Sequence, residues 1–251
     1  MTTTPTEFES SGTMSHDRAM KLAQVEIGRM IDVVDQLRPP DWSLPTDCEG
    51  WDVKALLSHQ LGAMEGNASL REFVRQYLVA TKKSKRSGRP LVDEMTASQV
   101  SDQASLSPGE LADRLRHKAQ ASVRGRRRMP ALMRAMPINP GAPFEGTWKL
   151  GYLVDTIMNR DFWMHRVDLT RATDLEMVLT PEHDGVIVGD VVREWARAHG
   201  QPFTLVLEGV AGGTFAQGQR GEEITLDAVE FCRVLSGRGH GSGLLSEKVP
   251  F

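Results

Sequence analysis

The segment from Leu150 to Thr173 constrains the fold most, because its spacing is helical and its apolar half contains ionisable side chains. On a helical wheel of about 100° per residue, Asp161, His165 and Asp168 fall in the middle of the apolar half. The opposite half is predicted to be polar and comprises Asp155, Thr156, Asn159, Arg160, Arg166 and Thr170. A carboxylate buried without a partner loses much of its hydration energy. The apolar face therefore needs either a bound cation or a dense network of hydrogen bonds.

Two explanations fit these three side chains. Asp161 and His165 are four residues apart, so both point to the same place one helical turn apart. Helical bundles build metal sites from such carboxylate and histidine pairs on facing helices. Asp168 then either accepts a hydrogen bond from the far nitrogen of the imidazole or serves as a ligand itself. The alternative is a metal-free Asp–His–Asp cluster whose hydrogen bonds set the helix register. A helix whose true phase differs from that of the wheel would require neither explanation.

The first 173 residues contain four segments with helical periodicity, separated by loops rich in proline and glycine. The predicted helices cover residues 15–37, 52–77, 107–129 and 150–173, and Gly66-Asn67 is a candidate interruption of the second. Asp52 is a good N-cap for the second helix, and Ser107 with Glu110 forms a capping box for the third. The basic run from Lys82 to Arg89 is predicted to be a solvated linker. Four helices joined by loops indicate a bundle.

The pattern changes after residue 173. A helix is predicted over residues 181–199, followed by strands over 203–208, 214–217 and 223–226 and a helix over 227–235. This is a small α+β unit, and the sequence predicts mainly α plus α+β overall. We expect a disordered tail over residues 1–14, a bundle domain over 15–173 and an α+β domain over 181–251.

Composition narrows the functional classes. The chain has 251 residues and a formal net charge of −3, which argues against a nucleic-acid partner. No apolar run is long enough to span a bilayer, so no membrane partner is expected. Two distant cysteines, Cys48 and Cys232, do not form a disulfide framework, and a reducing, cytoplasmic setting is expected. The sequence does not indicate an oligomeric state.

A third metal ligand has to come from another helix. Among the six histidines besides His165, His59 is the best candidate, because it lies mid-helix beside the small residues Ala55 and Ala63. Its phase is more than about 100° from the centre of the apolar stripe of its own helix. Periodicity alone therefore does not predict that His59 is buried.

Three stretches together resemble a known family. The stretch from Pro45 to Val53 (PTDCEGWDV), followed by Leu56 to His59 (LLSH), is similar to the N-terminal signature of the mycothiol-dependent maleylpyruvate isomerase family. Arg160 to Leu169 (RDFWMHRVDL) resembles the second metal motif of that family. The residues from Leu226 to the C-terminus are similar to its C-terminal domain, which is related to sterol carrier proteins. The resemblance implies a DinB-like, metal-binding four-helix bundle.

The resemblance also implies a ligand set and cofactors. The family binds its metal through a histidine of the second helix and an acidic residue and a histidine of the last helix, which correspond here to His59, Asp161 and His165. The family pattern has glutamate at the acidic position, whereas this chain has the shorter Asp161. A zinc-type ion and the low-molecular-weight thiol mycothiol are the implied cofactors. Arg238, in the C-terminal signature, is a candidate for binding a carboxylate of the thiol or substrate.

Two functions follow from this interpretation. Two histidines and one carboxylate leave a coordination position open, as in catalytic metal sites. A metal favours the thiolate form of a bound thiol, and the thiolate can add to an electrophilic carbon. The first hypothesis is thus an isomerase acting on a maleylpyruvate-type substrate, or an S-transferase acting on another electrophile. The alternative is a non-catalytic protein, braced by the metal, that binds a ligand or a partner.

Overall fold

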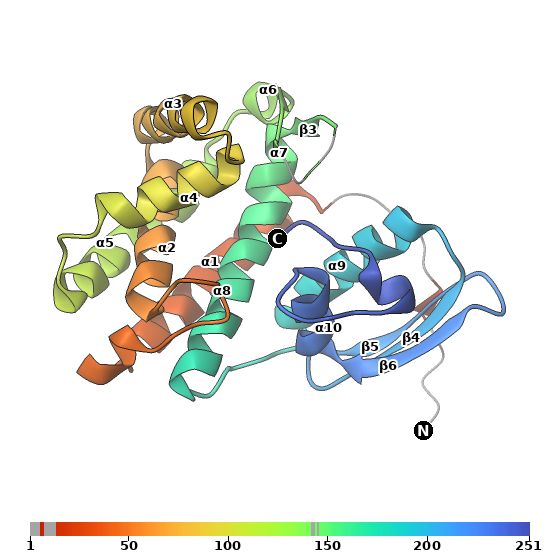
Figure 1. The fold of residues 1–251 in the computed structure, drawn as a ribbon. Helices are drawn as coiled ribbons and strands as arrows, with labels where there is room; N and C mark the ends of the chain where they lie inside the picture. The colour runs from red at the N-terminus through yellow and green to blue at the C-terminus, as the bar shows by residue number, and fades with distance from the viewer. Residues whose placement is uncertain (1–5, 8–13, 142–143, 145) are drawn as a thin grey trace. The chain divides into compact units, whose positions relative to one another are not determined.

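The computed structural model describes residues 6–7, 14–141, 144 and 146–251 (Figure 1). The chain divides into two compact units. One comprises Ser15–Glu176, and the other comprises Met177–Phe251 together with the N-terminal residues. Thr6–Glu7 form a short strand, β1, which pairs with β5 of the second unit. Apart from these two residues and Met14, the tail predicted over residues 1–14 lies outside the described residues.

The first unit is helical, as the sequence predicts. Its main helices are α1 (His16–Val34), α2 (Val53–Ala68), α3 (Leu70–Ser87), α4 (Leu91–Asp102), α5 (Pro108–Arg127) and α8 (Met158–Thr173). Shorter elements are η1 (Pro39–Ser43), α6 (Ala131–Arg134), β2 (Pro137–Ile138), β3 (Trp148–Lys149), α7 (Leu150–Tyr152) and η2 (Leu153–Ile157). The bundle consists of α1, α2, α5 and α8, and α3 and α4 pack together against α2 (Figure 1). The predicted fold class, a helical bundle followed by a small α+β part, is confirmed.

Helix starts agree with the predicted caps. The Asp52 carboxylate accepts a hydrogen bond from the backbone N–H of Ala55 at 2.8 Å and caps the start of α2. Ser107 and Glu110 form the expected capping box at the start of α5.

The basic run from Lys82 to Arg89 is not the predicted linker. Residues 82–87 are the last turns of α3, which ends where Gly88 adopts a φ of 74°. Lysine and arginine have good helix propensity, and basic side chains near a helix C-terminus interact favourably with the helix dipole. A run of charges looks the same in sequence whether the backbone is a solvated helix or a loop, and this explains the error.

The polar half of the last bundle helix is buried as well as the apolar half. Asp155, Asn159, Arg160, Arg166 and Thr170 are all buried. The helix is surrounded on more than one side, and its polar groups are paired inside the protein. Arg166, for example, donates from Nε to Glu26 Oε1 at 2.6 Å. The π-helical turn η2 changes the phase of the wheel before Met158, and a uniform 100° step cannot reproduce this change.

The second unit has α9 (Asp184–His199), β4 (Phe203–Glu208), β5 (Gly213–Gln217), β6 (Glu222–Asp227), α10 (Ala228–Leu235) and η3 (Gly243–Ser246). The strand order is β1-β5-β4-β6, with β4 antiparallel to β5 and parallel to β6. Trp195 is buried and packs edge-to-face against Phe203 and Phe231, which places the core between α9, β4 and α10. In neither unit do the described residues include a helix of the length and apolarity that a bilayer crossing requires.

Candidate metal centre

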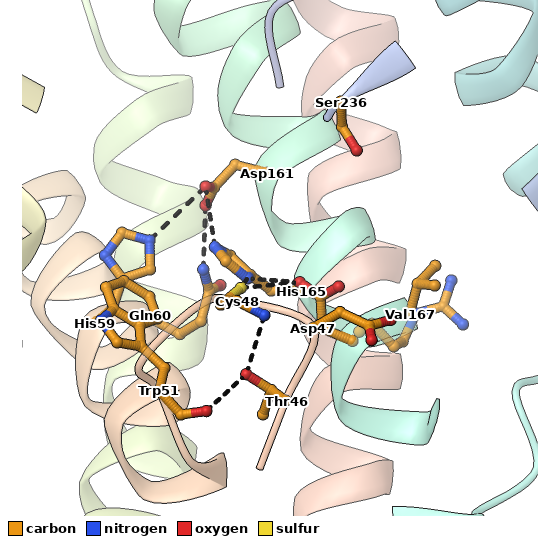
Figure 2. Close-up of polar contacts among 12 residues, drawn as sticks. Thr46, Asp47, Cys48, Trp51, His59, Gln60, Asp161, His165, Val167 and Ser236 are labelled. Atoms are coloured by element: carbon orange, nitrogen blue, oxygen red, sulfur yellow. Dashed lines mark hydrogen bonds and ion pairs between the residues drawn. The ribbon is translucent and has the colours of Figure 1, made fainter. Parts of the chain in front are cut away.

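Two bundle helices bring three donor atoms to one point. His59 lies in the middle of α2, and Asp161 and His165 lie on successive turns of α8. Asp161 Oδ1 is 3.6 Å from His59 Nε2 and 3.3 Å from His165 Nε2 (Figure 2). One donor atom from each of the three residues falls within 4.8 Å of the others. The structure thus brings together the three residues that the sequence and the resemblance single out.

The spacing of these atoms suits a tetrahedral metal ion. With metal–ligand bonds of about 2.0–2.2 Å, the donor atoms of a tetrahedral site lie about 3.3–3.6 Å apart. The two distances from Asp161 Oδ1 to the imidazole nitrogens fall in that range. Two imidazoles and one carboxylate form a donor set typical of zinc sites with an open position. The three residues therefore fit a divalent ion of the zinc type.

The far nitrogen of each imidazole has a hydrogen-bond partner. His165 Nδ1 is 3.1 Å from Asp168 Oδ2, and His59 Nδ1 is 2.7 Å from Gln99 Oε1. Both partner oxygens are acceptors, so each Nδ1 carries the proton and each Nε2 faces Asp161. Such outer hydrogen bonds orient metal-binding histidines and set their tautomer.

Cys48 adjoins the His165–Asp168 pair. Its Sγ lies 3.3 Å from Asp168 Oδ2. The same atom lies 3.7 Å from His165 Nδ1 (Figure 2). These atoms are on the opposite edge of the imidazole from Nε2. Cys48 therefore contacts the group that orients His165 and lies away from the point where Nε2 meets Asp161.

The charges of Asp161 and His165 stabilise one another. Burial acts to raise the pKa of Asp161, but the adjacent imidazoles of His165 and His59 outweigh it and hold the pKa well below its usual value. Burial acts to lower the pKa of His165, but Asp161 and then Asp168 outweigh it and hold that pKa well above its usual value. A metal ion bound at Nε2 must displace a proton from His165. Binding of a metal ion here would therefore release protons and weaken as the pH falls.

Burial of His59 is the main feature that periodicity did not predict. Its residue exposure is 5%, although it lies off the apolar stripe of α2. The helix α4 packs on this side of α2 and covers His59 with Gln99. The apolar pattern of α2 marks only the side facing the bundle core, so it does not report contact with a further helix.

Sequence reasoning missed three further residues of the site. Gln60 is fully buried, and its Nε2 donates to Asp161 Oδ2 at 3.0 Å. The ring of Trp51 lies beside both imidazoles, with centroids 5.3 Å from His59 and 6.2 Å from His165. The third is Gln99. Trp51 is inside the motif that carries the family resemblance, which is a usable signal, whereas nothing in the sequence marks Gln60 or Gln99.

Arg238 belongs to the other compact unit. It follows α10 and is half-buried, and its backbone N–H donates to the carbonyl of Arg233. Its predicted role in binding a carboxylate stays a prediction. Two arginines of the site helix have partners within the first unit, because Arg166 pairs with Glu26 and Arg171 Nε donates to Asp47 Oδ2 at 2.9 Å.

The fold and the site define the first unit as a four-helix bundle with a candidate His–Asp–His metal centre. The family model for the mycothiol maleylpyruvate isomerase N-terminal domain matches residues 23–170, more than half of the chain. The chain belongs to this family, which confirms the resemblance seen in the motifs.

Solved structures give the same fold. The mycothiol-dependent maleylpyruvate isomerase is 15% identical, with a TM-score of 0.57 and 90% of each chain covered. A histidine-to-alanine mutant of that enzyme is 14% identical, with the same score and coverage. A search of curated protein sequences found no match. At this sequence identity the structural similarity establishes the fold only, because proteins of one fold can have different activities.

Asp168 provides a first test of the site. We expect Asp168→Asn to lower zinc affinity about 10–100-fold, because the amide weakens the hydrogen bond that orients and polarises His165. Competition with a chromogenic chelator measures the affinity, and a stoichiometry still close to one shows that no ligand has been lost. A stoichiometry near zero would instead make Asp168 a ligand, the alternative that the sequence leaves open.

Proposed function

We propose that this chain is a metal-dependent enzyme that uses a low-molecular-weight thiol, mycothiol, to isomerise a maleylpyruvate-type substrate or to transfer the thiol to another electrophile. The observation that carries the proposal is the convergence of His59 Nε2, His165 Nε2 and Asp161 Oδ1 at one point. Membership of the family supports the thiol and the class of reaction. We propose zinc as the ion, on the basis of the donor set.

The residues have distinct parts in this proposal. His59, Asp161 and His165 hold the ion and leave a coordination position open. A bound ion and thiol together would supply a thiolate whose reversible addition to a conjugated double bond permits rotation about that bond. Gln60 fixes the second oxygen of Asp161, so that Oδ1 faces the imidazoles. The Asp161 side chain is 25% exposed while those of His59 and His165 are 7% and 8% exposed, so access is from the side of Asp161.

The activity test uses the full chain loaded with zinc. Maleylpyruvate is incubated with the protein in the presence and absence of mycothiol, and the trans isomer is quantified by liquid chromatography. A chromogenic electrophile is tested in parallel for thiol transfer. We expect turnover that needs both metal and mycothiol and that is lost in Asp161→Ala. Tight metal binding with no thiol-dependent turnover of either probe would favour the non-catalytic alternative.

A further inference from the structure

A chain of buried amides leads away from the candidate metal centre. Gln99 of α4 accepts from His59 Nδ1 at 2.7 Å, and its own Nε2 donates to Gln76 Oε1 of α3 at 2.9 Å. Gln76 Nε2 donates in turn to the Gly62 carbonyl at 2.9 Å and to Glu72 Oε1 at 3.0 Å. Gln76 and Gln99 are 4% and 5% exposed. Two helices outside the four-helix bundle thus reach a candidate metal ligand.

The last acceptors of this hydrogen-bond chain fix which group donates and which accepts at each step. A backbone carbonyl and a carboxylate only accept hydrogen bonds, so Gln76 must direct its NH₂ group toward Gly62 and Glu72. Its oxygen then faces Gln99, and Gln99 must donate to it. The oxygen of Gln99 is left to face His59. His59 Nδ1 has to be the donor, because an amide oxygen cannot donate.

This direction matters for metal binding. A neutral imidazole has one N–H and one lone pair, so a proton held on Nδ1 leaves the lone pair on Nε2. Nε2 is the atom that lies 3.6 Å from Asp161 Oδ1. His165 reaches the same tautomer by a shorter route, through the carboxylate of Asp168.

A glycine allows the helices to come this close. A Cβ atom at Gly62 would lie 2.6 Å from both Cβ and Cγ of Gln99. Such a contact is too short, so α4 approaches α2 to this distance only because residue 62 has no side chain. The backbone carbonyl of Gly62 is also one of the two acceptors at the end of the hydrogen-bond chain.

We propose that α3 and α4 are part of the metal centre, because Gln76 and Gln99 form a directional hydrogen-bond chain that keeps the proton of His59 on Nδ1 and presents Nε2 to the ion. In this role the two glutamines are positioning residues. The inference rests on the metal centre of the proposed function and requires neither the thiol nor a particular substrate.

Zinc affinity of the purified full chain tests the proposal. Gln99→Leu should lower the affinity about 10–100-fold, the usual effect of losing an outer hydrogen-bond partner of a metal ligand. Gln99→Glu keeps an oxygen for His59 Nδ1 but cannot donate to Gln76 Oε1, so it should bind zinc more tightly than Gln99→Leu and less tightly than the unmodified protein. Rescue by glutamate distinguishes positioning of the imidazole from simple filling of space. Equal affinity in Gln99→Leu and the unmodified protein, or no rescue by glutamate, would overturn the proposal.

Gln103→Leu is the matched control. Gln103 is also buried, at 4% exposure, and it follows α4 directly, but its Nε2 donates to Glu65 Oε2. We expect this variant to keep its zinc affinity even where its thermal stability falls. If Gln103→Leu lost affinity as strongly as Gln99→Leu, general loosening of α4 would explain both results and the proposal would fail.

Two more variants test the same hydrogen-bond chain at positions other than Gln99. Gln76→Met leaves Gln99 in place but removes the groups that orient its amide, and should reduce zinc affinity at least about fivefold. Gly62→Ala should separate α4 from α2 and lower the affinity to a similar degree. Unchanged affinity in both folded variants would contradict the inference. If the unmodified protein itself bound no zinc, the proposed function would fall first, whereas normal zinc binding in Gln99→Leu would remove only the amide chain.

Discussion

Replacing His165 by alanine is expected to abolish stoichiometric zinc binding. Both ring nitrogens of His165 have an acidic partner, since its Nε2 faces Asp161 and its Nδ1 contacts Asp168. Loss of an outer hydrogen bond costs about 10–100-fold in metal affinity, and loss of a ligand should exceed the upper end of that range. The remaining two donors cannot complete a site of three protein ligands.

Elemental analysis after gel filtration measures the effect, and His59→Ala should behave in the same way. His117→Ala is the matched control, because His117 lies on an exposed part of α5 and should leave about one ion per chain. If both His165→Ala and His59→Ala retained one zinc ion per chain, the three-residue centre would be wrong. Metal lost only in His165→Ala would exclude His59 and leave Asp168 as the third ligand.

The second large effect is on stability. Glu26 of α1 and Arg166 of α8 form a two-point ion pair, with Nε to Oε1 at 2.6 Å and Nη2 to Oε2 at 3.0 Å. Both side chains are at most 1% exposed. Removing one partner of a buried ion pair typically costs about 3–5 kcal/mol. We therefore expect Glu26→Gln to reduce the free energy of unfolding by about 3–5 kcal/mol, as measured by urea titration.

An exposed ion pair with a single contact provides the comparison. Arg116 Nε lies 2.7 Å from Asp35 Oδ1, but both side chains are more than 40% exposed. Asp35→Asn should cost less than about 1 kcal/mol, because water compensates the lost partner. The double variant Glu26→Leu with Arg166→Met should recover part of the loss, since no unpaired charge remains. A cost for Glu26→Gln no larger than that for Asp35→Asn would show that the buried pair does not hold α1 and α8 together.

The shorter acidic residue still reaches both imidazoles. Asp161 has one methylene fewer than the glutamate of the family pattern, yet its Oδ1 lies within 3.6 Å of both Nε2 atoms. Gln60 holds the other oxygen and so restricts the rotation of the carboxylate. In this chain the helices α2 and α8 are close enough for aspartate to bridge them.

Local patterns predicted much of this protein. Caps at Asp52 and Ser107, alternating residues in β4 and the spacing of Asp161 and His165 depend on nearest neighbours along the chain, and they appear as expected. An ionisable group placed within an apolar stripe is a signal of the same kind, because burial of the stripe forces the group inward.

Other features depend on residues that are distant in sequence. His59 is buried because α4 covers the side of α2 on which it lies, away from the apolar stripe, and its tautomer depends on Gln99 and Gln76 from two further helices. Arg166 is internal because Glu26, 140 residues away, meets it. Helical periodicity reports which side of a helix is apolar and carries no information about which polar groups meet across an interface. The sequence pattern therefore predicted that Asp161 and His165 point to the same place on α8. Only the packing of other helices against α8 brought His59 and its partners to them.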